Sequence, residues 1–251
     1  YEHYCGKWIG KAYRIVIPVT LALLIAVLIS AAGATAKQYF DLNPVLGSGM
    51  MAVLILAVYL AGFEKMVRIV SGISPFVIAF TVFVGITTLL KDANTLSDAE
   101  AFSALEASQA APHWLLSALL YLSLNFICGS TYYTALGRTA DTRENALTGV
   151  LVGAVAILIT LTVMNYAILS NAREIAVYPV PTLYLARKIS KVFAAIFSVI
   201  LLMGMFSSCA TTVWSFCSEC FAKDPKKNRI FSVATVVVCL ALGFVPFGSL
   251  V

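Results

Sequence analysis

The sequence predicts an all-α membrane protein, a bundle of about seven transmembrane helices in one domain that covers residues 1–251. Hydrophobic residues make up 61% of the chain and charged residues 12%, whereas an average soluble domain is roughly half apolar and about a quarter charged. Most of the apolar residues come in blocks of about 17 to 25, the length at which a helix crosses roughly 30 Å of hydrocarbon, and the shorter second block is expected to extend into its flanks. The predicted spans are residues 15–36, 49–62, 73–90, 113–136, 146–169, 192–216 and 230–247.

Lys and Arg residues lie in short clusters between these spans and set the expected orientation. Counted over alternate connectors, eleven basic residues fall on the side of the chain's start and six on the other side. The start is therefore predicted to be cytoplasmic. The net charge is +5, but the basic residues do not form a continuous face with interleaved aromatic residues, so we expect no nucleic acid as partner. The expected partner is the lipid bilayer.

Motifs of common enzymes do not occur. The sequence has no Walker A, G-x-S-x-G or H-E-x-x-H pattern, which argues against an ATPase or a hydrolase, so we expect no enzyme activity and no cofactor. Cys217 and Cys220 form a single C-x-x-C without a second pair or a nearby His, so no metal site is expected there. Because the chain starts at Tyr1 without a signal peptide and stops directly after an apolar block, we expect it to be part of a longer protein.

Small residues repeat four apart in two of the predicted spans. Such a stripe lies on one helical face and lets a neighbouring backbone approach closely. The first span is therefore expected at the centre of the bundle. Close packing without any contact to a solute explains both stripes equally well. The residues are Ala22, Ala26, Ser30 and Ala34 in the first span, and Gly149 and Gly153 in the fifth.

The fourth span concentrates the mid-membrane polarity, with Ser123, Asn125 and the run Gly129-Ser130-Thr131. Glycine tolerates a helix break, and short polar side chains can satisfy the freed backbone groups. A broken helix would expose amides that attract a carboxylate and carbonyls that can hold a cation. The alternative is a continuous helix in which Asn125 bonds to a neighbour.

The sixth span carries hydroxyls near its middle. Ser207 and Ser208 follow Gly204, and Thr211 and Thr212 lie one turn later. Hydroxyl and carbonyl oxygens are hard ligands that suit a cation such as Na⁺. The alternative is that these hydroxyls bond back to carbonyls of the preceding turn, as is common in membrane helices.

An internal repeat relates the two ends of the chain. A shift of 180 residues lays Tyr4-Cys-Gly-Lys7 and Lys11 over Tyr184-Leu-Ala-Arg187 and Lys191, and each stretch precedes a long span, a connector and another span. Five spans separate the two copies, and this odd offset turns one copy upside down in the membrane. Inverted repeats of this kind are typical of secondary transporters.

Four stretches of the sequence together match the pattern of a known family: Tyr4-Cys-Gly-Lys-Trp-Ile-Gly-Lys11, Ser30-Ala-Ala-Gly-Ala34, Trp114-Leu-Leu-Ser-Ala-Leu-Leu-Tyr-Leu-Ser-Leu-Asn125 and Pro181-Thr-Leu-Tyr-Leu-Ala186. In these stretches the sequence resembles the YkvI-like bacterial inner-membrane proteins, a branch of the amino acid, polyamine and organocation (APC) superfamily with the LeuT fold. The resemblance covers the whole chain and implies that its spans correspond to transmembrane helices 3 to 9 of that fold, with helices 1, 2 and 10 onward missing. It also implies a location in the bacterial inner membrane.

What the resemblance implies is a secondary transporter of an amino acid or a similarly small solute, coupled to Na⁺ or H⁺. The stretch from Asn125 to Ser130 would be the unwound middle of helix 6, and Gly33 would lie near the substrate. Ser207 and Ser208 would be hydroxyls of a sodium site. A membrane receptor that senses a solute without moving it, as in spore germinant receptors, is the alternative, and a membrane assembly component is a third.

Overall fold

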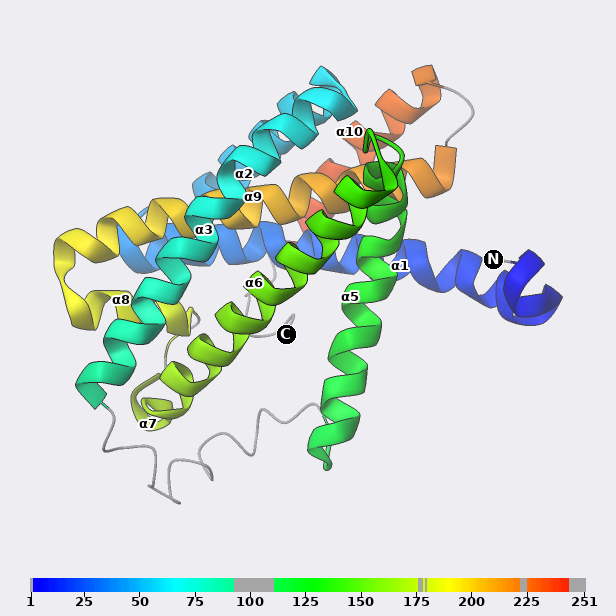
Figure 1. The fold of residues 1–251 in the computed structure, drawn as a ribbon. Helices are drawn as coiled ribbons and strands as arrows, with labels where there is room; N and C mark the ends of the chain where they lie inside the picture. Colours follow the sequence, from blue (N-terminus) through cyan, green and yellow to red (C-terminus); the bar gives the residue numbers. More distant parts are fainter. Residues whose placement is uncertain (1, 93–110, 176–177, 179, 222–224, 244–251) are drawn as a thin grey trace.

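A computed structural model describes residues 2–92, 111–175, 178, 180–221 and 225–243. These residues form helices and no strands, and Figure 1 shows the long helices crossing one another in one bundle. The elements are α1 Glu2–Phe40, α2 Pro44–Ala61, α3 Phe63–Asp92, α5 Trp114–Gly137, α6 Arg143–Leu169, α7 Ala172–Ile175, α8 Pro181–Ile189, α9 Lys191–Phe221 and α10 Pro225–Leu242.

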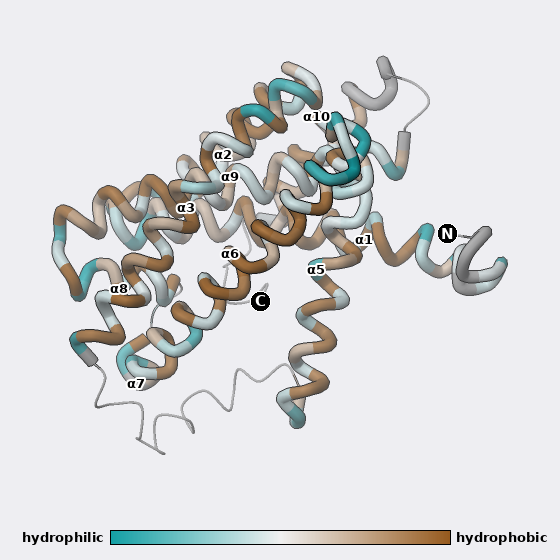
Figure 2. Tube along the Cα trace, in the orientation of Figure 1, coloured by the Kyte–Doolittle hydropathy of each residue, from teal (hydrophilic) through white to brown (hydrophobic). Residues whose placement is uncertain are grey.

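Six of the described helices are long and apolar enough to cross a membrane: α1, α2, α3, α5, α6 and α9. They contain the first six predicted spans, and the coarse class of a multi-pass membrane protein is confirmed. The seventh span coincides with the shorter apolar stretch Ile230–Leu242 of α10, and its predicted end at residues 244–247 lies outside the described residues. Apolar residues cover much of the outer surface, most evidently on α5 and α6 (Figure 2).

Helix ends differ from the predicted span ends, because the helices continue into the polar flanks. Residues 63–72, predicted as a connector, are the first turns of α3, and Gly62 with a φ of 100° turns the chain directly from α2 into α3. At the other end of α2, the Asn43 side chain accepts a hydrogen bond from the Val45 amide at 3.0 Å and caps the helix. The 31 residues of α9 span about 46 Å, so this helix extends beyond a hydrocarbon layer of about 30 Å.

The centre of the fold is a core of four helices, α1, α2, α9 and α10, each of which packs against the other three. Helices α1 and α9 run antiparallel (Figure 1). The hydroxyl of Tyr39 near the end of α1 donates to the Lys191 carbonyl at the start of α9, at 3.0 Å. The buried apolar residues of this core include Leu21 and Ile25 of α1, Ile55 of α2 and Val213 of α9.

The small-residue stripe of α1 lies in this core, as predicted. Ala26 and Ser30 are buried, and the Cys239 thiol of α10 comes within 3.5 Å of the Ala22 carbonyl. The pair Gly149 and Gly153 behaves differently, because among the described residues nothing approaches within 4 Å of a Cβ built on either glycine. The close helix contact expected there is therefore wrong for the described part of the chain, and this face of α6 is open.

A short helical hairpin between α6 and α9 was predicted only as a connector. Helix α8 buries Leu183, Leu185 and Ala186 against the bundle. Lys188 donates to the Asn171 side-chain oxygen at 2.6 Å and forms an ion pair with Glu174 at 3.2 Å. Lys188 belongs to the basic group Arg187, Lys188 and Lys191, which the predicted orientation places on the side opposite the chain's start, and the ion pair offsets one charge of this group.

We predict that Gly33→Ala destabilises the bundle. An added Cβ would meet the Pro44 carbonyl oxygen at 2.7 Å, and forced overpacking costs about 1–3 kcal/mol. Each kcal/mol shifts the melting temperature of a chain of this size by about 2–4 °C. Thermal unfolding of the purified protein in detergent should therefore show a loss of several degrees.

Gly149→Ala is the matched control, because its added methyl group meets open space and alanine favours a helix over glycine by about 1 kcal/mol. Its melting temperature should stay unchanged or rise. An equal loss in both variants would contradict the packing role of Gly33.

Candidate functional site

The predicted break in the fourth span is absent. Helix α5 is continuous from Trp114 to Gly137, and the polar side chains of Asn125, Ser130 and Thr134 bond back to their own helix. The Asn125 amide donates to the Tyr121 carbonyl at 2.8 Å and the Ser130 hydroxyl to the Ile127 carbonyl at 3.2 Å. Because the side chains of Asn125 and Ser130 find hydrogen-bond partners within α5, the helix does not have to break to satisfy them. The prediction of an unwound segment in the fourth span is therefore wrong.

The five residues predicted to bind substrate do not come together. Ser123 and Asn125 are exposed on α5, and the Tyr133 ring covers Gly129 one turn later. Gly33 is buried where α1 meets the start of α2, and the Ser48 hydroxyl beside it donates to the Ile29 carbonyl at 3.0 Å. In this structure Gly33 serves close helix packing.

The predicted ion ligands lie near the midpoint of α9. The Thr211 and Thr212 hydroxyls donate to the Ser208 carbonyl at 2.9 and 2.7 Å, so this turn satisfies itself. Gly204 faces α3, with Val77 at 3.3 Å from a Cβ built on it. No cluster of three or more His, Cys, Asp or Glu side chains able to hold a metal ion occurs in the part of the chain that the structure describes. A sodium role for Ser207 and Ser208 stays a prediction.

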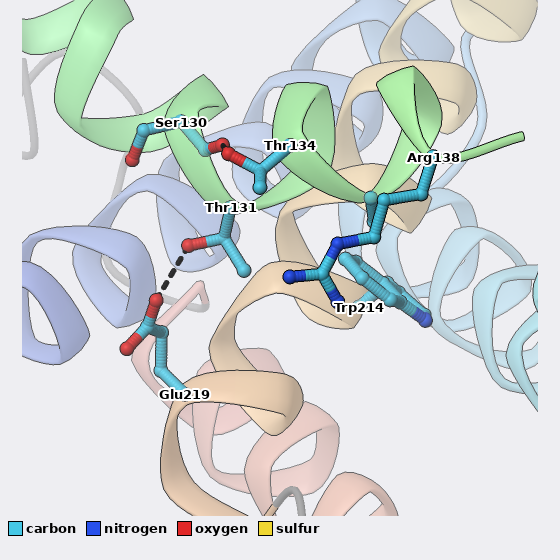
Figure 3. A pocket seen from close by; sticks show the side chains of 7 residues that line it. Ser130, Thr131, Thr134, Arg138, Trp214 and Glu219 are labelled. Atoms are coloured by element: carbon cyan, nitrogen blue, oxygen red, sulfur yellow. Dashed lines mark hydrogen bonds between the residues drawn. The ribbon is translucent and has the colours of Figure 1, made fainter. Parts of the chain in front are cut away.

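An open cavity of about 400 Å³, lined mostly by residues with polar side chains, lies between α5 and α9, close to the ends of both helices. Of the predicted site residues, Ser130 alone lines it. Figure 3 shows the Arg138 and Glu219 side chains entering from opposite sides, with Thr131 between them. The lining residues are Ser130, Thr131, Thr134, Ala135, Arg138, Trp214 and Glu219.

One hydrogen bond joins the two walls of this cavity. The Thr131 hydroxyl of α5 donates to a carboxylate oxygen of Glu219 on α9, at 2.6 Å. An aromatic cluster of α3, α5 and α9 lies behind it, with ring centroids of Phe63 and Trp214 at 4.5 Å and of Tyr132 and Trp214 at 6.3 Å. Such edge and tilted ring contacts each contribute about 0.5–1.5 kcal/mol beyond the area they bury. These contacts hold α5 on α9 and fix the indole as a wall.

The cavity therefore offers three kinds of polar group: a guanidinium, a carboxylate and side-chain hydroxyls. Sequence reasoning missed Arg138 and Glu219 because it ended the spans at residues 136 and 216 and placed both in connectors. A signal was present nonetheless. Ser130, Thr134 and Arg138 are four apart, which places them on one face of a continuous helix.

A second cavity, of about 490 Å³, lies among α1, α2, α3 and α9. Its lining is apolar and includes Ala32, Met50, Ile73 and Phe206. Without a polar side chain it has no means to orient a charged or hydrogen-bonding solute. The cavity between α5 and α9 is therefore the better candidate site.

We predict that Thr131→Val weakens the contact between α5 and α9. Valine keeps the shape of threonine but removes the donor to Glu219, and a hydrogen bond to a charged group contributes about 1.5–3 kcal/mol. The melting temperature in detergent should fall by a few degrees. Thr134→Val is the control, since that hydroxyl bonds to the Ser130 carbonyl within α5 at 2.7 Å. Equal melting temperatures of the two variants would show that the Thr131 bond contributes nothing.

No protein-family model, curated protein or solved structure matches the chain.

Proposed function

We propose that this protein is a secondary transporter that moves an amino acid or a similarly small solute across a bacterial inner membrane by alternating access, coupled to Na⁺ or H⁺. The observation that carries the proposal is the packing of the four core helices. The sequence repeat pairs α1 with α9 and α2 with α10, and these are the helices that form the centre of the bundle.

The geometry of this core agrees with an inverted repeat. Helices α1 and α9 are antiparallel, as an offset of five spans between the two copies requires, and hydrogen bonds link them at 3.0 Å between Tyr39 and Lys191 and 3.9 Å between Thr35 and Met205. Helix α2 packs on α9 just as its counterpart α10 packs on α1. Bundles built from two inverted copies can exchange an outward-open and an inward-open arrangement at little cost, because each copy can adopt the other's packing.

Burial separates a fixed part of the bundle from a looser one. Helix α1 is the most buried of the six long apolar helices, whereas none of the residues of α5 is buried and α6 buries few. A transporter needs such a division, because one group of helices has to rock against another. We assign α5 and α6 to the moving part, because they bury the fewest residues of the long described helices.

The test is uptake by the purified protein in liposomes. Tritiated amino acids, supplied as a mixture with an inward Na⁺ or H⁺ gradient, should accumulate saturably, and an ionophore that collapses the gradient should abolish accumulation. Protein-free liposomes give the background. Binding without gradient-dependent uptake would replace transport by the receptor function, since a sensor needs the same recognition chemistry but no flux.

A further inference from the structure

We propose that the apolar cavity among α1, α2, α3 and α9 binds the acyl chain of a lipid from the surrounding bilayer. The cavity has a volume of about 490 Å³, and none of its lining residues carries a polar side chain. It is separate from the cavity between α5 and α9. The inference depends on the bundle lying in a membrane and does not depend on transport.

The chemistry of the lining restricts the class of ligand. A water molecule inside a protein makes about three hydrogen bonds, and this cavity has no side chain to supply them. A polar solute would likewise find no group that fixes its orientation. A hydrocarbon chain needs no such group, because each of its methylene groups is held by van der Waals contacts alone. The ligand that fits this lining is therefore a hydrocarbon.

The cavity opens onto the surface that faces the lipid. Its rim is formed by Met50, Leu54 and Val199, which keep 63%, 53% and 48% of their surface exposed. Its floor includes Ala32 and Met51, which are 0% and 5% exposed. The wall of the cavity is thus continuous with the outer apolar surface of the bundle. An acyl chain of a neighbouring lipid reaches the floor from the side without leaving the hydrocarbon layer.

The length of the cavity matches one leaflet of a bilayer. Its lining begins at Phe40, the last residue of α1, and the hydrogen bond from Tyr39 to Lys191 places the start of α9 at the same level. The lining reaches Phe206, about 22 Å along α9 from Lys191. One leaflet with its headgroup region is about 20 Å thick. The mouth therefore lies beside the connector at residues 41–43, and the inner end lies near the midpoint of α9.

The side chains of the lining suit a ligand without a fixed shape. Three of the six methionines of the chain, Met50, Met51 and Met203, line the cavity. Methionine is unbranched and flexible, so it adapts to irregular space. Small residues form the part of the wall where α1 meets α2, and a Cβ built on Gly47 would come within 2.6 Å of the Ala36 Cβ. The small residues leave room, and the methionines adjust to the chain that fills it.

Photocrosslinking in lipid nanodiscs tests the inference. The purified protein is reconstituted in phosphatidylcholine that contains a small fraction of the same lipid with a diazirine at the end of one acyl chain. After illumination, the adducts located by mass spectrometry should include Met51 and Phe206. These side chains are only 5% and 9% exposed, so a lipid has to enter the cavity to reach them. A diazirine close to the ester group should label Phe40 at the mouth instead.

Val199→Trp places a large ring at the rim of the cavity. Exclusion of even two methylene groups weakens the binding of a chain about tenfold, so the adducts at Met51 and Phe206 should fall by at least that factor. Val150→Trp is the matched control, because it makes the same change on the exposed face of α6, and its adducts should equal those of the unmodified protein. Thermal unfolding in detergent shows whether each variant is folded, and Met203→Trp at the same opening replaces Val199→Trp if that variant is not.

Three results would overturn the inference. The first is the absence of adducts at both Met51 and Phe206, which would leave the cavity to a protein segment or to a small apolar solute. Labelling of the same residues by a water-soluble alcohol that carries a diazirine, but not by the lipid, would identify such a solute. The second is an equal yield of adducts in Val199→Trp and in the unmodified protein. The third is an equal loss in Val199→Trp and Val150→Trp, which would indicate a general effect on the bundle.

Discussion

The antiparallel contact between α1 and α9 is the interaction on which the rest of the bundle depends. In a bilayer the lipid is as apolar as the helix surfaces, so helices associate through close packing and through hydrogen bonds between them. This pair has both: small buried residues such as Ala26 and Cys209 in one shared core, and polar links at Thr35 and Tyr39. Helices α2, α3, α5, α8 and α10 all pack on α9, and α6 joins the bundle through α3.

This arrangement makes the two walls of the polar cavity unequal. One wall is the end of α9, which continues from the buried core and carries Trp214 and Glu219. The other wall is α5, which buries none of its residues and is held by an aromatic cluster and the hydrogen bond from Thr131. A helix held by few contacts opens at a lower free energy than the core does. The wall formed by α5 is therefore the one whose position any additional contact in the cavity changes most easily.

The hydrophobic lengths in the sequence were enough to predict the spans, because the thickness of a bilayer is a strong constraint that acts on every helix separately. The stripe around Ala26 predicted the central helix for a similar reason, since close packing requires small residues. The prediction of a break near Gly129 was wrong because the side chains of Asn125 and Ser130 can form hydrogen bonds with the backbone of a broken helix or of an intact one. Only the neighbouring helices decide between the two. The close helix contact predicted at Gly149 was wrong for a similar reason, because small residues permit a close contact but do not supply the neighbouring helix.

The position of charged residues along α9 follows from the cost of burying charge in a bilayer. The same cost explains why the prediction of spans left Glu219 outside the sixth span. Near the midpoint of the helix the polar groups are hydroxyls, and those of Thr211 and Thr212 bond back to the Ser208 carbonyl, so that stretch presents little unsatisfied polarity. Glu219 lies a few turns later, near the end of α9, where a carboxylate costs less free energy than at the centre of a bilayer. A window that averages hydropathy ends the span before this residue, although the helix continues to Phe221. The charged side chains that line the cavity, Arg138 and Glu219, therefore lie at the ends of their helices, in residues that a span prediction assigns to connectors.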